Sequence, residues 1–446
     1  MIMNDLPTGD TSWFTAARFG MFIHWGLYAL PARHEWIQTE ERIPAEAYRR
    51  YFEHFDPDRF DPEAWARAAA AAGMRYVVIT AKHHEGFCLW DSKHTDYTAV
   101  NTPAGRDLLR PTLEAFRRHG LRAGVYYSLI DWHHPDFVIG TCKPDGPYRD
   151  HPEREAMNAG RDQSRYAAYM RDQVRELLTD YGDIDIIWFD FSYPDWNGTG
   201  TGKGHEAWES ERLLRLVREL RPDIIVDDRL DLPYGWDIKT PEQIQPPGPI
   251  TVDGEPAVWE ACQTFSGSWG YHRDEQSWKS IDMLVRMLVD TVAKGGNLLL
   301  NVGPTARGQF DGRALERLSG MGGWMDLHER AIRGCGAAPQ EWPVPPDCRY
   351  TWNPDTGRLY LHIFAWPFGH VLLPGLADRI AHAQFLHDGS EVLMSDCRRF
   401  AHQSTEKGWD GYDWSQMLML KLPIRQPDTP VPVIELVLQE PAATAG

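Results

Sequence analysis

The sequence lacks the features that mark membrane proteins, secreted proteins and disulfide-stapled proteins. No run of 18 or more apolar residues is long enough to cross a bilayer, and residues 1–10 hold no basic stretch followed by an apolar one, as a secretory signal would. The six cysteines are scattered without a C-x-x-C pair, so neither a zinc site nor a disulfide framework is indicated. We therefore expect a cytoplasmic protein with reduced thiols.

Positive charge is scarce as well. The 46 Lys and Arg residues are outnumbered by 64 Asp and Glu residues, which leaves a formal net charge of −18. Such an acidic chain is unsuited to nucleic acid or to an anionic membrane, because both bind proteins through basic surfaces. The remaining composition, with 42% hydrophobic residues, is that of a folded protein. The length of 446 residues indicates one large domain plus a smaller one, or two of middling size.

The sequence does contain a regular alternation of short apolar runs with amphipathic stretches over its first three quarters. The stretches predict helices, such as Pro62–Ala72 and Ser164–Asp180. Continuous apolar strands that alternate with helices are typical of a parallel sheet covered on both faces. No G-x-G-x-x-G follows a strand, which disfavours an open dinucleotide-binding sheet, and about eight units predict a (β/α)8-like TIM barrel. The predicted strands include Met21–Trp25, Tyr76–Thr80, Ala123–Ser128, Ile184–Asp190, Ile224–Asp228 and Asn297–Val302.

The pattern changes after Gly334. Residues 335–347 are rich in Pro and Ala and are typical of a linker. Beyond them, short runs separated by turns predict an antiparallel β-sandwich, with strands at Leu359–Phe364, Val371–Leu373, Gln384–His387, Gln416–Leu422 and Val431–Val437. We therefore divide the chain into a barrel domain over residues 1–334 and a C-terminal β-sandwich domain over residues 335–446.

The predicted strand ends and the loops after them are rich in His, Trp and acidic residues. These positions carry the catalytic groups of a parallel barrel. They hold His24, Glu35, Trp36, His83, His84, Tyr126, Trp188, Asp190, Arg229, Glu242, Glu260 and Trp269. Seven of the 19 Trp residues lie there: Trp25, Trp36, Trp90, Trp132, Trp188, Trp236 and Trp269. Because sugars present flat apolar faces, this placement favours a carbohydrate site.

Several reaction classes can be weighed against these residues. No G-x-S-x-G is present for serine hydrolysis, and the adjacent His83 and His84 would point to opposite faces of a strand, which disfavours a metal site. Paired carboxylates with aromatic walls remain, which is what glycoside hydrolysis requires. Asp190 ends an apolar strand, and its partner is Glu242 or the rival Glu260. The alternative interpretation is a buried structural Asp190 beside a plain surface Glu242.

At these residues the sequence resembles the α-L-fucosidases of glycoside hydrolase family 29. The resemblance implies a barrel followed by a β-sandwich, and a retaining mechanism without metal or cofactor. The substrate would be a fucosylated oligosaccharide or glycoside, cleaved at its terminal α-L-fucosyl residue, and a homo-oligomer is compatible with it. The matching segments are Arg18–Trp36, Tyr76–Tyr97, Gly124–Phe137, Ile184–Phe191, Val226–Arg229, Lys239–Gln243, Val258–Glu275 and Lys294–Gly308.

The resemblance also implies roles for individual residues. Asp190 matches the nucleophile, and Glu242 falls in the acid/base loop, with Glu260 as the alternative. Phe191 stands where many members have Gly, and the family's N-D-R reads Asp227-Asp228-Arg229. The residues that match sugar-binding positions are His24, Glu35, Trp36, His83, His84, Tyr126, Trp188 and Arg229, to which we add Trp269 from its strand-end position.

Three other functions stay open at this point. One is an α-glycosidase of the same family that acts on a related sugar such as L-galactose. Another is a carbohydrate-binding barrel without catalysis, and the third is a metal-dependent hydrolase. The presence of both proposed acids, Asp190 and Glu242, counts against the binding barrel.

Overall fold

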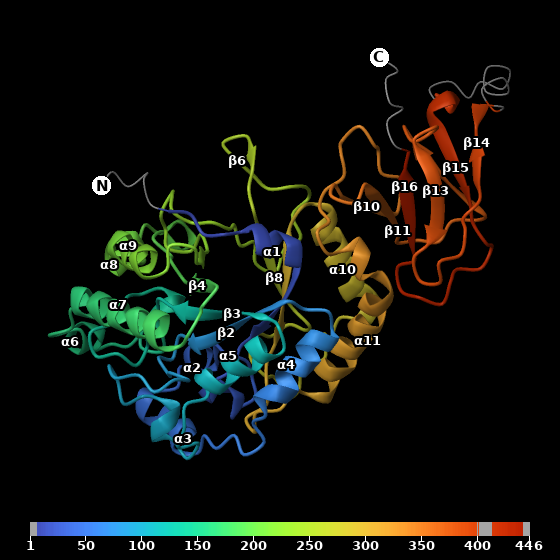
Figure 1. The fold of residues 1–446 in the computed structure, drawn as a ribbon. Coiled ribbons are helices and arrows are strands. Elements are labelled where there is room, and N and C mark those ends of the chain that lie inside the picture. The colour runs from blue at the N-terminus through green and yellow to red at the C-terminus, as the bar shows by residue number, and fades with distance from the viewer. Residues whose placement is uncertain (1–6, 399, 401–412, 440–446) are drawn as a thin grey trace.

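The structure is a computed structural model that describes residues 7–398, 400 and 413–439. Its centre is a seven-stranded sheet with the order β5-β4-β3-β2-β1-β9-β8 (Figure 1), in which every neighbouring pair is parallel. The predicted α/β class with a parallel sheet is thereby confirmed. The strands are β1 (Phe19–Ile23), β2 (Tyr76–Lys82), β3 (Arg122–Ser128), β4 (Ile186–Asp190), β5 (Ile225–Val226), β8 (Glu260–Thr264) and β9 (Asn297–Val302).

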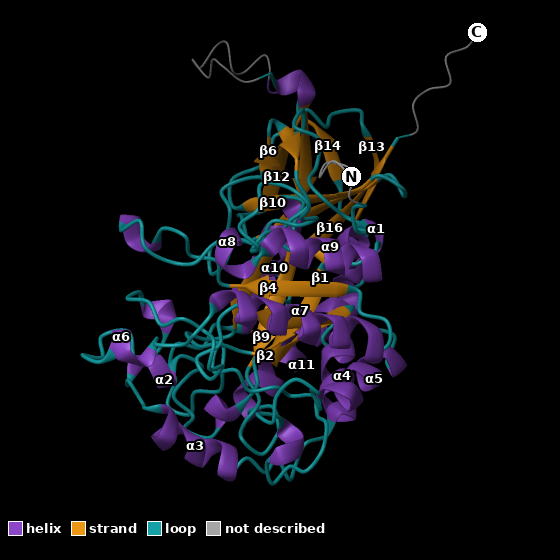
Figure 2. Ribbon diagram, turned by 90° about the vertical axis from the view of Figure 1, so that its left-hand side faces the viewer, coloured by secondary structure: helices purple, strands orange, loops and turns teal. Residues whose placement is uncertain are grey.

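Helices cover the outside of this sheet (Figure 2). The predicted helix over 62–72 is α4, which begins at Pro62 because the Asp61 side chain accepts a hydrogen bond from the Ala64 amide. No helix of the described residues is long and apolar enough to cross a membrane. The helices are α1 (Ser12–Ala17), α2 (Ile37–Glu40), α3 (Ala45–Glu53), α4 (Pro62–Ala71), α5 (Leu109–Arg118), α6 (Arg154–Met157), α7 (Gln163–Asp180), α8 (His205–Trp208), α9 (Ser210–Leu220), α10 (Ile281–Ala293) and α11 (Gly312–His328).

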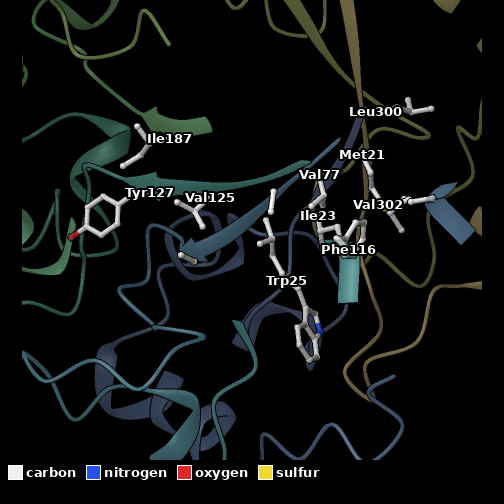
Figure 3. Close-up of a cluster of buried hydrophobic side chains, with 14 of the residues drawn as sticks. Met21, Ile23, Trp25, Val77, Phe116, Val125, Tyr127, Ile187, Leu300 and Val302 are labelled. Carbon is white, nitrogen blue, oxygen red and sulfur yellow. The ribbon is translucent and has the colours of Figure 1, made fainter. Parts of the chain in front are cut away.

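The side chains of each strand alternate between two hydrophobic clusters. Met21 and Ile23 of β1 belong to the large cluster between the sheet and its helices (Figure 3), whereas Phe22 belongs to a second cluster on the inner face. The inner cluster also holds Ile225 of β5 and Cys262 of β8, which are the two edge strands. The sheet is therefore curled, so that its edges approach one another.

A short segment lies between these two edges. Ile238 makes a single parallel bridge to Asp227, which follows β5, and Glu242 makes one to Cys262 of β8. This segment makes isolated bridges at both edges without forming a regular strand. It places Glu242 beside the sheet although the residue belongs to a loop.

Strand β8 differs from the prediction. Residues 259–260 were expected at or after a strand end, but Glu260 is the first residue of β8. The strand reads EACQT, and its polar residues are buried. Because sequence patterns recognise strands by apolar runs or by alternation, this segment gave no strand signal.

The C-terminal part contains two antiparallel sheets that share one hydrophobic cluster (Figure 1). The linker-like segment contributes Trp342 to that cluster. The Trp324 indole of α11 donates a hydrogen bond to the Val431 carbonyl, which joins these sheets to the part that contains the seven-stranded sheet. One sheet has the order β10-β11-β16-β13, from β10 (Cys348–Asn353), β11 (Arg358–Ile363), β13 (Ile380–Phe385) and β16 (Val433–Leu438). The other is β12-β15-β14, from β12 (His370–Pro374), β14 (Met394–Asp396) and β15 (Met417–Lys421), and a small hairpin pairs β6 (Thr251–Val252) with β7 (Glu255–Pro256).

Candidate active site

Two carboxylates meet at one guanidinium beyond the end of β4. Arg229 Nη1 donates to Asp190 Oδ1 at 2.9 Å and to Glu242 Oε2 at 2.7 Å. Because both oxygens bind the same nitrogen, the distance between them cannot exceed the sum of the two hydrogen-bond lengths. That limit is compatible with the spacing of about 5–5.5 Å between the carboxyl groups of retaining glycosidases and lies below the ~6.5–9.5 Å of inverting ones.

Asp190 is held on its other side by Tyr126. The Tyr126 hydroxyl donates to Asp190 Oδ2 at 2.7 Å from the neighbouring strand β3. Burial raises the pKa of Asp190, and the charge of Arg229 opposes that rise. Burial also raises the pKa of Tyr126 well above its ordinary value, so the phenol keeps its proton as a donor. Asp190 thus has one fixed donor on each oxygen, which orients the carboxylate.

His24 is neutral, and its proton can be assigned from its partner. Its Nδ1 lies 2.7 Å from Asn301 Oδ1, while Asn301 Nδ2 donates to the Trp269 carbonyl at 2.6 Å. The Asn301 oxygen can only accept, so His24 Nδ1 carries the proton. Burial lowers the pKa of His24 well below its ordinary value, which leaves Nε2 as a hydrogen-bond acceptor.

His84 has the same tautomer for a similar reason. The Ser128 hydroxyl donates its one proton to the Ile130 carbonyl at 2.9 Å and therefore accepts from His84 Nδ1 at 2.7 Å. Burial lowers the pKa of His84 well below its ordinary value and that of His83 to about 4. The site thus presents neutral imidazoles. Among the described residues, no three His, Cys, Asp or Glu side chains are grouped so that they could hold a metal ion.

An inner chamber lies above the inner face of the sheet and brings most of the predicted residues together. Glu35 and Arg229 are not among its lining residues: Glu35 accepts from the Gly270 amide at 2.8 Å, and Arg229 contacts the carboxylates from the side. The lining residues are Phe22, His24, Trp36, His83, His84, Tyr126, Trp188, Asp190, Phe191, Glu242, Cys262 and Trp269.

Two lining residues, Phe22 and Cys262, were not singled out from the sequence. Phe22 lies two positions before His24 and therefore points to the same face of the chain. The alternation of side chains along a strand could have identified it as a lining residue. Cys262 lies on β8, the strand that gave no strand signal. Together they give the chamber an apolar wall.

Only three of the seven strand-end Trp residues line this chamber, namely Trp36, Trp188 and Trp269. Trp25 points to the outer cluster and packs against Trp65 with ring centroids 5.1 Å apart, because it alternates with the inward-facing His24. Trp90 is buried and donates to Glu176. Trp25 and Trp90 therefore belong to the core, although their strand-end positions were counted toward the carbohydrate site.

Glu260 lies at the opposite end of the strands from Asp190. It pairs in register with Asn297, the first residue of β9, and accepts a hydrogen bond of 2.5 Å from Tyr76, the first residue of β2. Its other oxygen accepts from the Trp188 indole at 3.3 Å. Glu260 therefore lies beneath the chamber and supports the Trp188 ring that forms part of its wall.

The Glu260→Gln variant should change how stability depends on pH. Burial raises the pKa of Glu260 from 4.5 to about 7, so between these values the folded chain keeps a proton that the unfolded chain releases. The stability of the wild type should fall as the pH rises through this window. Glu260→Gln should not show this part of the fall, because glutamine does not ionise. Urea unfolding measures the free energy of unfolding of both proteins at pH 5 and at pH 8. The difference, Glu260→Gln minus wild type, should increase by on the order of 2 kcal/mol from pH 5 to pH 8.

The control is Glu316→Gln on α11, whose side chain is 71% exposed. It should follow the wild-type pH dependence, because an exposed carboxylate keeps its water in both states. Equal pH slopes for the wild type and Glu260→Gln would contradict the assignment of a proton to buried Glu260.

Sequence and structure comparisons identify the family to which this fold and this pair of acids belong. A sequence model of the family described as "Alpha-L-fucosidase" matches residues 7–330. The chain belongs to the α-L-fucosidase family. It is a glycoside hydrolase of family GH29, which confirms the family resemblance found in the sequence.

Relatives with this description match most of the chain. Plasma α-L-fucosidase of Rattus norvegicus is 31% identical over 82% of this chain and 79% of its own length. The structure of α-L-fucosidase isoenzyme 1 from Paenibacillus thiaminolyticus is 44% identical, with a TM-score of 0.88 over 96% of this chain and 99% of that one. A GH29 α-L-fucosidase of Bacteroides thetaiotaomicron, solved as a trapped covalent intermediate with 2-fluoro-fucosyl fluoride, has a TM-score of 0.78 at 26% identity over 96% of this chain and 95% of that one.

Proposed function

We propose that this α-L-fucosidase removes terminal α-L-fucosyl residues with retention of configuration, with Asp190 as nucleophile and Glu242 as acid/base. The observation that carries the proposal is the contact of both carboxylates with Nη1 of Arg229. It supports the short spacing that a covalent intermediate requires. The relative from Bacteroides thetaiotaomicron, which was trapped as such an intermediate, supports the same chemistry.

The reaction takes two displacements at the anomeric carbon. In the first, the Asp190 carboxylate attacks that carbon while its bond to the leaving oxygen breaks, and Glu242 gives its proton to that oxygen. In the second, Glu242 takes a proton from a water molecule, whose oxygen attacks the same carbon and releases Asp190. Two inversions return the α configuration. Arg229 supplies a positive charge to both carboxylates, which favours the ionised form of Asp190 for attack.

The neutral imidazoles and the apolar wall suit fucose. The acceptor nitrogens of His24 and His84 can each receive a hydroxyl proton from the sugar, and neither imidazole carries a charge that would compete for it. Fucose has a methyl group where L-galactose has a hydroxymethyl group. Phe22 and Cys262 offer that methyl group an apolar contact and offer a hydroxyl group little, which favours fucose over L-galactose.

A panel of aryl α-glycosides tests the proposed function. Turnover of the α-L-fucoside, with kcat/KM at least about tenfold above that of the α-L-galactoside, is the expected result, because a buried unpaired hydroxyl group costs about 1–3 kcal/mol. Equal rates for the α-L-fucoside and the α-L-galactoside would favour an α-glycosidase that accepts both sugars. Sugar binding without turnover would favour a non-catalytic carbohydrate-binding barrel. NMR of the reaction should show that the α-anomer of fucose is the first product released.

We also propose the finer architecture. The bridge of Ile238 to Asp227, just after edge strand β5, and that of Glu242 to Cys262 of edge strand β8 support a closed (β/α)8-like barrel. The hydrophobic cluster shared by the two C-terminal sheets supports a β-sandwich. We place the boundary of the catalytic domain at residues 334/335, close to the end of the segment that the family model matches.

A further inference from the structure

Glu85 is a buried carboxyl group that the proposed mechanism does not use. It follows β2 and is 2% exposed, and within the described residues neither of its oxygens has a hydrogen-bond partner. Gly26 leaves room for the group, because a Cβ at that position would lie 2.8 Å from Glu85 Oε1. A carboxylate without hydrogen bonds is costly to bury, so this environment favours the neutral, protonated form of Glu85.

The imidazole of His83 faces this carboxyl group. His83 Nδ1 lies 3.5 Å from Glu85 Oε2. This nitrogen is also buried, and it has no hydrogen-bond partner in the part of the chain that the structure describes. Two buried polar atoms at this distance can satisfy each other after a small approach, provided that one of them carries a proton and the other a lone pair.

The proton between these two atoms belongs to Glu85. Burial raises the pKa of Glu85 from 4.5 to about 8, and the charge of Asp131, which is paired with Lys82 at 3.2 Å, adds to that rise. Burial lowers the pKa of His83 to about 4, so at neutral pH the imidazole carries one proton only. When Glu85 donates to Nδ1 of His83, that single imidazole proton must be on Nε2.

The charges around His83 favour the same tautomer. Negative charge on Glu35 and on Asp190 opposes the fall of the His83 pKa, so both carboxyl groups act on the imidazole. Asp190 lines the same chamber as His83, and a carboxylate that faces an imidazole favours an N–H over a lone pair. Burial raises the pKa of the neighbouring phenols and lowers that of the neighbouring imidazoles, so these groups are neutral: Tyr28, Tyr48, Tyr97, Tyr126, His24 and His84.

We propose that Glu85 is a positioning residue: its protonated carboxyl group donates to Nδ1 of His83 and thereby makes Nε2–H of His83 a hydrogen-bond donor in the chamber. The inference rests on the proposed function and deepens it by giving the site a pH-dependent donor. His24 and His84 present acceptor nitrogens. Because a sugar hydroxyl both donates and accepts, a chamber with acceptors and a donor can fix the direction of its proton.

The pair should respond to alkaline pH. When Glu85 loses its proton to the solvent, its carboxylate can only accept, so the imidazole proton of His83 moves from Nε2 to Nδ1 and the chamber loses its donor. The value of kcat/KM for a dinitrophenyl fucoside should therefore fall by about tenfold as the pH rises through the Glu85 pKa of about 8. The first step with this substrate needs no acid, so the ionisation of Glu242 does not produce the fall.

Two variants of Glu85 separate hydrogen-bond donation from packing. Glu85→Met has a side chain of similar length but no donor, so kcat/KM at neutral pH should fall by about tenfold. Glu85→Gln supplies an amide N–H that does not ionise, so it should recover most of that loss and remove the alkaline fall. The matched control is Glu63→Gln, which replaces a carboxyl group 2.9 Å from Nε2 of His119 on the outside of the molecule and should keep the wild-type pH profile.

The tautomer can be measured directly in the wild type by NMR of protein labelled with 15N in its histidine rings. The His83 signals, identified by their absence from His83→Gln, should show the proton on Nε2 at neutral pH and on Nδ1 once Glu85 has ionised. The inference is overturned if Nδ1 carries the proton at neutral pH, if Glu85→Gln keeps the alkaline fall, or if Glu85→Met retains the wild-type kcat/KM. Failure of the wild type to hydrolyse aryl α-L-fucosides would instead contradict the proposed function, and the tautomer measurement needs no turnover, so the two failures are distinguishable.

Discussion

Replacing Asp190 with glycine should lower kcat/KM for aryl α-L-fucosides by on the order of 10⁴-fold or more. The loss follows from the removal of the carboxylate that Tyr126 and Arg229 jointly orient at the end of β4. The remaining groups can still bind the sugar, so KM should change far less than kcat. Steady-state kinetics with a 4-nitrophenyl fucoside measure both.

Azide identifies the role of Asp190 through the stereochemistry of the product. In Asp190→Gly, azide can enter the space left by the carboxylate and displace the leaving group once, which gives the β-fucosyl azide. Asp183→Asn is the control, because the Asp183 side chain is 89% exposed and its removal should leave kcat/KM unchanged. Wild-type activity in a folded Asp190→Gly variant would contradict the assignment of the nucleophile.

The sequence predicted the parallel sheet because β1, β2, β3, β4 and β9 are apolar on both faces. The covering helices place one face in a hydrophobic cluster and the curl of the sheet places the other in a second cluster. Strand β8 could not be predicted in this way, because Glu260 and Gln263 are buried there in polar surroundings. Strand β14 has only three residues and carries no periodic signal.

The site was predictable to the extent that strand ends converge. Their strand-end positions singled out His24, Tyr126 and Asp190 as candidates, and the structure brings them to one chamber. The contact between Arg229 and Glu242 depends on the loop of residues 230–241, whose path follows no local pattern. For the same reason, the Trp residues could not be sorted into core and chamber from their nearness to strand ends, since alternation sends neighbouring side chains to opposite faces.

Glu242→Ala should separate the two halves of the reaction. Fucosides with poor leaving groups need the acid, so their kcat/KM should fall by about 10²–10⁴-fold, while the first step with a dinitrophenyl fucoside should change little. The second step lacks its base and becomes slow, so the glycosyl-enzyme accumulates and a burst of dinitrophenol is expected. Pre-steady-state absorbance measurements detect that burst.

Azide should then restore turnover of the dinitrophenyl fucoside and give the α-fucosyl azide, because it attacks the intermediate from the face opposite Asp190. The configuration is the reverse of that expected for Asp190→Gly, so the pair of variants assigns both carboxylates. Glu260→Ala provides the decisive comparison: Glu260 lies at the amino end of β8 beneath Trp188, and azide should not accelerate that variant. Rescue of Glu260→Ala without rescue of Glu242→Ala would transfer the acid/base role to Glu260, and the guanidinium contact of Glu242 would then be electrostatic support for Arg229 alone.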